Sequence, residues 1–153
     1  MSSKKVLVLY YSGSGNTKKM AKAIGEAMKS SAVNVTLEDV GKFDISSLPN
    51  YDSIVLGSPT YFSNVAWQVK KVIDESIVHY SGGKLKGKVA GIFTSAGTSS
   101  NGKDCLKMLD VALGVHHGMK VVQGIIRVDG EGDKEVEKRC EEYGRRLVRE
   151  IEK

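Results

Sequence analysis

The sequence predicts a doubly wound α/β fold, in which a five-stranded parallel sheet lies between two layers of helices. Two patterns along the 153-residue sequence predict this fold. Short apolar runs rich in β-branched residues are typical of strands that are covered on both faces. Between these runs the apolar residues recur with the spacing of an amphipathic helix. Strand and helix alternate five times, and such alternation favours a parallel sheet.

Five segments are expected to form the strands. Three are strongly apolar, and two are weaker partners. In chain order they are 6–11, 33–37, 53–57, 89–94 and 121–128. The order 2-1-3-4-5 is favoured for a sheet of five strands with right-handed crossovers.

Four segments show one apolar helical face each. In the last of these the apolar residues Val136, Cys140, Tyr143, Leu147 and Ile151 recur at steps of three or four. The other faces are Met20 to Met28, Val69 to Ile77 and Cys105 to Leu113. The link Asp39–Tyr51 is short and contains Pro49, so any helix there must be brief. We expect residues 1–153 to form a single domain in a three-layer α/β/α arrangement.

The composition excludes several classes of protein. Only two cysteines occur, Cys105 and Cys140, and they match no zinc or disulfide pattern. No run approaches the roughly 20 apolar residues of a membrane span, and the short run after Lys4 and Lys5 lacks the features of a secretion signal. We therefore expect a cytoplasmic protein without membrane insertion and without a metal site.

The net charge of +5 is unevenly distributed along the chain. Residues 131–153 hold seven basic and eight acidic side chains, so residues 1–130 carry a net charge of +6. This excess leaves a basic nucleic-acid-binding module open as a remote alternative. No recognition motif accompanies the lysines, so no nucleic-acid partner is expected.

The loop after the first strand has the composition of a phosphate-binding loop. Two glycines allow several backbone N–H groups to point inward, hydroxyl and amide groups add further donors, and a helix begins directly afterwards. It is not the dinucleotide motif G-x-G-x-x-G, because Lys18 stands where the last glycine is required. The candidate residues are Ser12, Gly13, Ser14, Gly15, Asn16 and Thr17.

The loop after the third strand carries two adjacent aromatic residues. Tyr61 is the better candidate for contact with a ring-shaped ligand, whereas Phe62 could equally pack beneath the following helix. Trp67, already inside that helix, is interpreted as a packing or interface residue. The candidate residues of this loop are Pro59, Thr60, Tyr61, Phe62, Ser63 and Asn64.

The loop after the fourth strand is small, polar and uncharged, which suits backbone hydrogen bonds to the edge of a heteroaromatic ring. Gly97 to Asp104 is one residue short of a Walker A motif, but Asp104 replaces the magnesium-binding hydroxyl. The adjacent His116 and His117 have no third ligand for a metal ion. The candidate residues of this loop are Thr94, Ser95, Ala96, Gly97 and Thr98.

These three loops in this order resemble the flavodoxin-like family, and the resemblance covers nearly the whole chain. Within the family, the motifs Pro59–Asn64, Gly97–Thr98 and His116–Met119 are most similar to WrbA-type NAD(P)H:quinone oxidoreductases. The uninterrupted fifth strand matches the short-chain flavodoxins. The resemblance implies FMN as cofactor, with its phosphate at Ser12–Thr17 and its ring between Thr60–Asn64 and Ser95–Thr98. It also implies that His117, as a catalytic residue, approaches the pyrimidine edge of the ring.

Two functions follow from the resemblance. The first is an electron carrier, which exchanges electrons through bound flavin with a redox partner protein. The alternative is a WrbA-type NAD(P)H:quinone oxidoreductase, in which nicotinamide and quinone take turns on an uncovered flavin face. A monomer and a homo-oligomer both remain open.

Overall fold

The computed structural model describes residues 3–29 and 33–153. Its sheet has the order β2-β1-β3-β5-β6, and every neighbouring pair along this path is parallel. These five strands correspond in sequence to the five expected ones, so the predicted order is confirmed. The strands are β1 (Lys4–Tyr10), β2 (Val33–Asp39), β3 (Ser53–Tyr61), β5 (Val89–Ala96) and β6 (Lys120–Val128).

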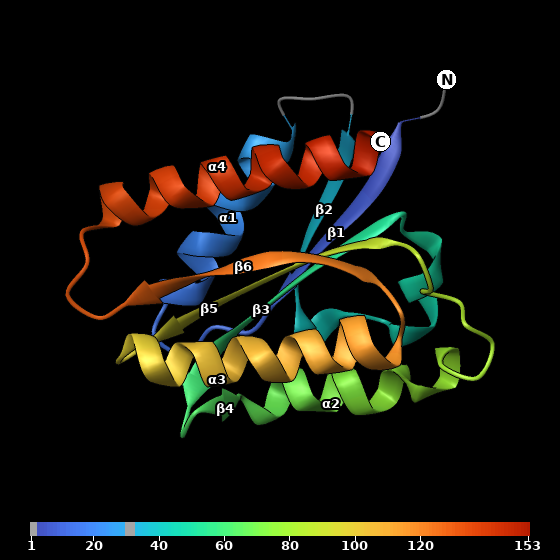
Figure 1. The fold of residues 1–153 in the computed structure, drawn as a ribbon, viewed down its shortest axis with the longest axis horizontal. Helices are drawn as coiled ribbons and strands as arrows, with labels where there is room; N and C mark the ends of the chain where they lie inside the picture. Colours follow the sequence, from blue (N-terminus) through green and yellow to red (C-terminus); the bar gives the residue numbers. More distant parts are fainter. Residues whose placement is uncertain (1–2, 30–32) are drawn as a thin grey trace.

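Helices cover both faces of the sheet, as Figure 1 shows. One face carries α1 and α4, and the other carries α2 and α3. The helices are α1 (Asn16–Lys29), α2 (Trp67–Glu75), α3 (Ser99–Asp110) and α4 (Asp133–Glu152). The flavodoxin-like three-layer fold is therefore confirmed.

Short elements complete the connections. The link after β2 contains only two 3₁₀ helices, in agreement with the brief helix expected around Pro49. A π-helical segment continues α3, and a two-residue strand folds back on β3 in an antiparallel hairpin. The short elements are η1 (Val40–Lys42), η2 (Ile45–Asn50), β4 (Asn64–Val65), η3 (Ser76–His79) and η4 (Val111–His116).

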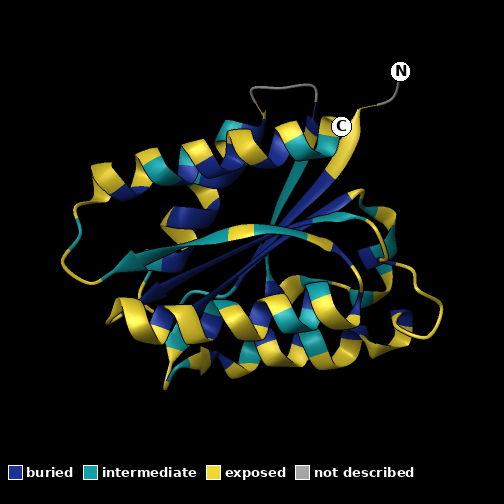
Figure 2. Ribbon diagram, viewed as in Figure 1, coloured by how far each residue is buried: buried dark blue, intermediate teal, exposed yellow. Residues whose placement is uncertain are grey.

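Two hydrophobic clusters, one on each face, hold the layers together. Figure 2 shows the central strands as the most deeply buried part of the chain, with exposed residues along the outer sides of the helices. Successive side chains of a strand point to opposite faces, so Val6 and Val8 pack under α1 and α4 while Leu7 and Leu9 pack toward α2 and α3. The near-continuous apolar runs of the sequence reflect this double coverage.

Tyr143 of α4 connects its helix to the sheet at a register shift between β5 and β6. Its buried hydroxyl accepts a hydrogen bond from the N–H of Ile92 at 2.9 Å and donates one to the carbonyl of Val122 at 2.8 Å. The irregularity would leave these two backbone groups without a ladder partner, and the hydroxyl supplies one to each.

The two cysteines are free and buried. Burial raises the pKa of Cys105, and it raises the pKa of Cys140 to about 12. Both thiols are therefore protonated at neutral pH, in agreement with a packing role. Among the helices of the described residues, none is long and apolar enough to cross a membrane.

Candidate functional site

The three candidate loops meet at the carboxyl edge of the sheet, where β1, β3 and β5 end (Figure 1). Because these strands are parallel neighbours, the segments that follow them emerge side by side. Two hydroxyl contacts connect the segments directly. Thr17 Oγ1 lies 2.8 Å from Ser95 Oγ, and Thr60 Oγ1 lies 2.6 Å from Thr94 Oγ1.

The loop after β1 has the backbone conformation of an anion cradle. Gly15 has a φ of +103°, which few other residues adopt, and α1 begins at the next residue. Ser12 Oγ accepts hydrogen bonds from the N–H groups of Gly15 at 3.1 Å and Lys18 at 3.2 Å. The first N–H groups of a helix lack carbonyl partners within the helix, so this loop offers donors to an anion.

The space above this loop is bounded by Tyr61. A Cβ atom built on Gly13 would collide with the Tyr61 hydroxyl, so the loop after β1 and the β3–β4 hairpin approach each other closely. Gly13 and Ser14 are exposed, and no acidic residue occurs between Ser12 and Thr17. A loop without acidic residues, at the start of a helix and beside an aromatic side chain, fits a phosphate attached to a flat ring.

The hairpin after β3 turns through Phe62 and Ser63, which both have positive φ, at 53° and 64°. Two consecutive positive φ values define a turn that normally requires asparagine and glycine. Phe62 is fully exposed, at 103% of its reference surface, so the possibility that it packs beneath α2 is wrong. Ser63 Oγ donates a hydrogen bond to Asn101 Oδ1 at 3.0 Å, which holds the tip against α3.

The aromatic side chains of this region therefore face solvent. Tyr61 is 44% exposed and Trp67, the first residue of α2, is 70% exposed. The packing role expected of Trp67 is not observed within the chain. An interface role stays a prediction.

Several of the predicted lining residues are buried and do not face the solvent. Pro59, Thr94, Ser95 and Ala96 are buried, and the hydroxyl groups of Thr94 and Ser95 form hydrogen bonds inside the protein. Gly97 and Thr98 are exposed, and Thr98 Oγ1 accepts a hydrogen bond from the N–H of Asn101, capping α3. The exposed part of this loop is thus available to a ligand edge.

Asp129 lies near this loop but is not among the residues predicted from the sequence. The N–H of Asp129, just after β6, donates to the carbonyl of Ala96 at 2.9 Å. Its carboxylate lies 3.8 Å from the position of a Cβ on Gly97. Asp129 lies more than 30 residues from this loop in the sequence, and only the parallel pairing of β5 with β6 brings it there.

His117 does not lie with the three loops. It precedes β6, at the amino edge of the sheet, whereas the loops lie at the carboxyl edge (Figure 1). With about 3.3 Å per residue, the eight residues of β5 separate the two edges by roughly 26 Å. His117 therefore lies far from the three loops of its own chain, and its approach to the flavin ring stays a prediction. The resemblance to the WrbA motif identifies His117 as a candidate but does not predict where in the fold it lies.

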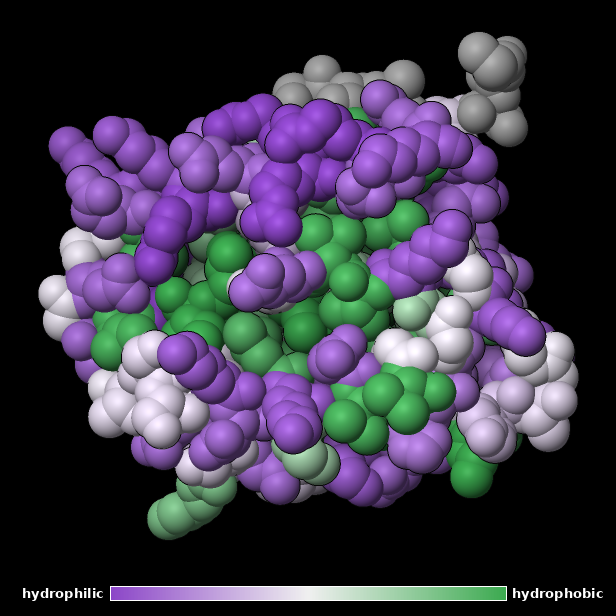
Figure 3. Space-filling view, viewed as in Figure 1, coloured by the Kyte–Doolittle hydropathy of each residue, from purple (hydrophilic) through white to green (hydrophobic). Residues whose placement is uncertain are grey.

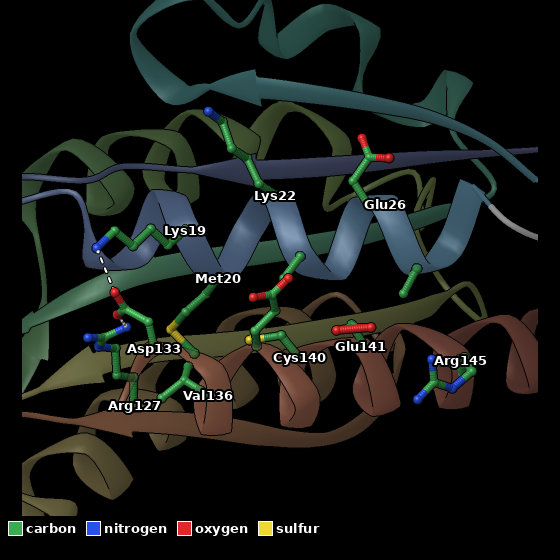
Figure 4. Close-up of a pocket in the computed structure, with 13 residues that line it drawn as sticks. Lys19, Met20, Lys22, Glu26, Arg127, Asp133, Val136, Cys140, Glu141 and Arg145 are labelled. Atoms are coloured by element: carbon green, nitrogen blue, oxygen red, sulfur yellow. Dashed lines mark hydrogen bonds and ion pairs between the residues drawn. The ribbon is translucent and has the colours of Figure 1, made fainter. Parts of the chain in front are cut away.

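A hollow of about 620 Å³ lies between α1 and α4, away from the loops. Figure 4 shows charged side chains of both signs along it. Asp133 accepts from Lys19 at 3.3 Å and from Arg127 at 2.7 Å, and these bonds lower the pKa of its carboxyl group. These two ion pairs join the start of α1, beside the loop Ser12–Thr17, to β6 and α4.

Comparisons with known proteins agree with this geometry. The flavodoxin domain model matches residues 7–117. An NAD(P)H dehydrogenase (quinone) of Rhizobium rhizogenes is 36% identical over 138 residues, which cover 77% of this chain and 69% of the relative.

Two solved structures are similar over almost their whole length. A flavodoxin from the domain Archaea has a TM-score of 0.84 and 27% identity, with 97% of this chain and 99% of that chain covered. The WrbA-like flavodoxin of Agrobacterium tumefaciens has a TM-score of 0.86 and 27% identity, with 98% of both chains covered. With the family model matching more than half of its length, the chain belongs to the flavodoxin domain family of FMN-binding redox proteins.

Proposed function

We propose that this chain is an electron carrier that exchanges electrons with a redox partner protein through FMN held at the carboxyl edge of the sheet. One observation carries the proposal. The loops Ser12–Thr17, Pro59–Asn64 and Thr94–Thr98 contain no carboxylate, amine or imidazole group of their own, and His117 lies at the other edge. The carboxylate of Asp129, beside Gly97, comes from outside these loops. A carrier needs no built-in acid or base, whereas quinone reduction takes up protons.

The chain's own residues have definite roles in this proposal. The N–H groups of Ser12–Thr17 bind the phosphate, and the Thr17–Ser95 contact fixes the distance between the phosphate loop and the loop after β5. Tyr61 and the exposed backbone of Gly97 and Thr98 orient the ring. Bound FMN supplies reversible uptake and release of electrons.

Exposure of the hairpin tip supports transfer to a partner. Phe62 projects fully into solvent beside the ring-binding region, held there by a turn that costs of order 1–3 kcal/mol per unfavourable residue. A partner surface that covers Phe62 and Tyr61 would exclude water from the ring edge. The free thiols of Cys105 and Cys140 support a reducing compartment such as the cytoplasm, and we propose that residues 1–153 act as one domain.

The second candidate is an NAD(P)H:quinone oxidoreductase. The relative in Rhizobium rhizogenes bears that name, and the ring-binding region here has no covering loop over Tyr61 in the described residues. Nicotinamide and quinone would stack in turn beside Tyr61, and catalysis would come from positioning alone. The match spans about two thirds of that relative's length.

An anaerobic reduction separates the two functions. The FMN-loaded protein is mixed first with NADH, then with NADPH, and finally with dithionite, while the visible flavin band is followed. A carrier keeps the band until dithionite or a reductase protein is added. Rapid bleaching by either nicotinamide, reversed by quinone, would establish the oxidoreductase, and failure to bind FMN would contradict both.

A further inference from the structure

The amino edge of the sheet carries exposed apolar side chains beside a group of lysines. Four apolar residues here are 50% to 70% exposed, namely Ile77, Val78 and Tyr80 after α2 and Val115 of η4. Ile77 and Tyr80 line one open groove together with His116, the neighbour of Val115. Figure 3 shows hydrophobic (green) surface over the end of α3 near η4, with weakly polar (white) and hydrophilic (purple) surface to its right. Exposed apolar side chains gathered in this way mark a surface that meets a protein or a membrane.

The turn between η3 and β5 places lysines next to these residues, and Figure 1 shows it projecting at the right of the view. Leu85 is fully buried and anchors the turn, whereas Lys84 and Lys86 on either side of it are exposed. The N–H of Lys84 donates to the carbonyl of His79 at 3.2 Å, and Lys86 Cγ lies 3.3 Å from the position of a Cβ on Gly118. The turn therefore holds Lys84 against the end of η3 and Lys86 beside the residues that precede β6.

Further lysines extend this basic surface along the starts of the strands. Lys4 of β1, Lys120 of β6 and Lys153 after α4 line a hollow of about 270 Å³, and Gly87 of the turn lines it too. Because Gly87 follows Lys86 directly, the turn and the hollow form one continuous basic surface.

Basic side chains outnumber acidic ones at this edge. Asp52 accepts a hydrogen bond from the N–H of Lys5 at 2.8 Å, and Glu150 accepts one from Lys153 Nζ at 2.7 Å. No acidic residue occurs between Glu75 and Asp104, a stretch that includes the whole turn. Seven lysines and three acidic residues, a net charge of +4, occur in the segments that meet here, which are 3–5, 50–53, 80–89, 118–120 and 150–153.

An anionic lipid bilayer is complementary to both parts of this surface. Lysines are attracted to anionic headgroups, and aliphatic side chains enter the boundary between headgroups and acyl chains. Tyr80 agrees with such a contact, since aromatic side chains with one polar end concentrate at the membrane interface. Nucleic acid is complementary to the lysines alone, because Ile77, Val78 and Val115 have no ring on which a base can stack.

We propose that the amino edge binds peripherally to the surface of an anionic bilayer. Ile77, Val78, Tyr80 and Val115 enter the interface, and the lysines of the turn contact lipid phosphates. The loops Ser12–Thr17 and Pro59–Asn64 lie at the opposite edge and stay open to solvent, so the proposal does not depend on bound FMN.

Sedimentation with lipid vesicles tests the proposal on the wild-type protein. One set of vesicles contains phosphatidylcholine alone, and the other contains equal amounts of phosphatidylcholine and phosphatidylserine. We expect binding to the phosphatidylserine vesicles to be at least about tenfold tighter, and to be the same after loading with FMN. No binding to either set, or equal binding to both, would overturn the proposal.

Two double variants with the same change in net charge test the place of the contact. Lys84→Gln with Lys86→Gln should weaken binding about 25-fold, or about fivefold for each lysine. Lys103→Gln with Lys107→Gln removes two exposed charges of α3, outside the turn, and should weaken binding by less than about twofold. Equal losses would show that net charge alone decides binding, and the proposed surface would be wrong.

A pair of uncharged variants tests the apolar part of the surface. Ile77→Gln with Val115→Gln keeps every charge and should weaken vesicle binding about tenfold. Trp67→Gln is the control, because Trp67 is also 70% exposed but stands at the start of α2, toward the other edge. A nucleic-acid surface would be insensitive to the first variant and would bind duplex DNA more tightly than the vesicles, and either result would overturn the proposal.

Tryptophan fluorescence reports which edge enters the bilayer. Trp67 is the only tryptophan of the sequence, and its emission in the wild type should not shift when phosphatidylserine vesicles are added. Tyr80→Trp combined with Trp67→Phe moves the single indole to the amino edge, and the emission of that variant should shift to the blue. The opposite pattern would show that the carboxyl edge meets the lipid, which contradicts the proposal.

Discussion

The two edges of the sheet carry different chemistry. The carboxyl edge presents backbone N–H groups, hydroxyl groups and exposed aromatic rings, on loops that directly follow β1, β3 and β5. The amino edge presents a neutral buried imidazole beside an apolar groove, assembled from the ends of α2 and η4. The parallel sheet thus keeps the loops of the proposed FMN site apart from the buried histidine.

The largest effect that we expect concerns the buried contact that joins the loops of the carboxyl edge. Thr17→Val leaves the Ser95 hydroxyl without its partner, and should lower the free energy of unfolding by about 1–3 kcal/mol. Urea denaturation measures the loss. Ser14→Ala, in the exposed part of the same loop, is the control and should change stability by less than about 0.5 kcal/mol.

A double variant sharpens this result. Removing both hydroxyl groups, in Thr17→Val with Ser95→Ala, leaves no unpaired group and should cost less than the two single changes together. Strictly additive losses would show that the contact contributes nothing of its own.

The next effect concerns access to the phosphate cradle. Gly13→Ala introduces a Cβ that must displace the Tyr61 hydroxyl, and we expect FMN affinity to fall about tenfold, or roughly 1.4 kcal/mol. Fluorescence titration of FMN measures the change. Gly132→Ala is the control, because no atom lies within 4 Å of its added Cβ.

The same steric explanation predicts a partial rescue. In a Tyr61→Phe background the colliding oxygen is absent, so Gly13→Ala should weaken FMN binding less than it does in the wild type. An undiminished loss would mean that the cradle itself, and not the approach of Tyr61, excludes the methyl group.

A smaller effect, of opposite sign, is expected at the hairpin tip. Replacing Phe62 and Ser63 by asparagine and glycine suits their positive φ values and should stabilise the protein by about 0.5–1 kcal/mol. Thermal unfolding measures the gain. Ser63→Ala keeps the unfavourable φ and removes the bond to Asn101, so it should not stabilise the protein.

The contribution of His117, at the amino edge, to the stability of the protein should depend on pH. His117 has a lowered pKa when folded, so the unfolded chain takes up a proton first as the pH falls below about 6.5. Stability should therefore decrease as the pH falls from about 6.5 toward the lower pKa of the folded state. His117→Phe removes this contribution, and its stability profile from pH 7 to 5 should be flatter than that of the wild type.

The smallest expected effect tests whether a change at the amino edge alters FMN binding at the carboxyl edge. Because the edges lie roughly 26 Å apart along β5, His117→Phe should change FMN affinity by less than about twofold. A tenfold loss of affinity would show that His117 reaches the ring after all, through a second copy of the chain.

The difference between the edges also explains what the sequence could predict. Strand order brings the loops after β1, β3 and β5 together, so strand ends alone predict that Ser12–Thr17 and Thr94–Thr98 lie at one edge. Asp129 could not, because the turn after β6 meets Ala96 only through strand pairing.

The direction of individual side chains is the second feature that the sequence could not predict. Phe62 turns outward because its backbone adopts a positive φ, which no periodicity reveals. His117 was read as part of the flavin site from a motif, although its position before β6 places it at the far edge. The groove beside it arises from the packing of helix ends that are distant in sequence, and no spacing predicts such a space.

One titration tests the proposed FMN site most directly. FMN is added to a ¹⁵N-labelled sample, and the resonances that move are recorded. We predict that FMN moves amides of Ser12–Thr17, Thr60–Asn64 and Ala96–Thr98 and leaves the ring resonances of His117 unchanged. Movement of the His117 ring resonances, or no movement of the loop amides, would contradict the proposed FMN site.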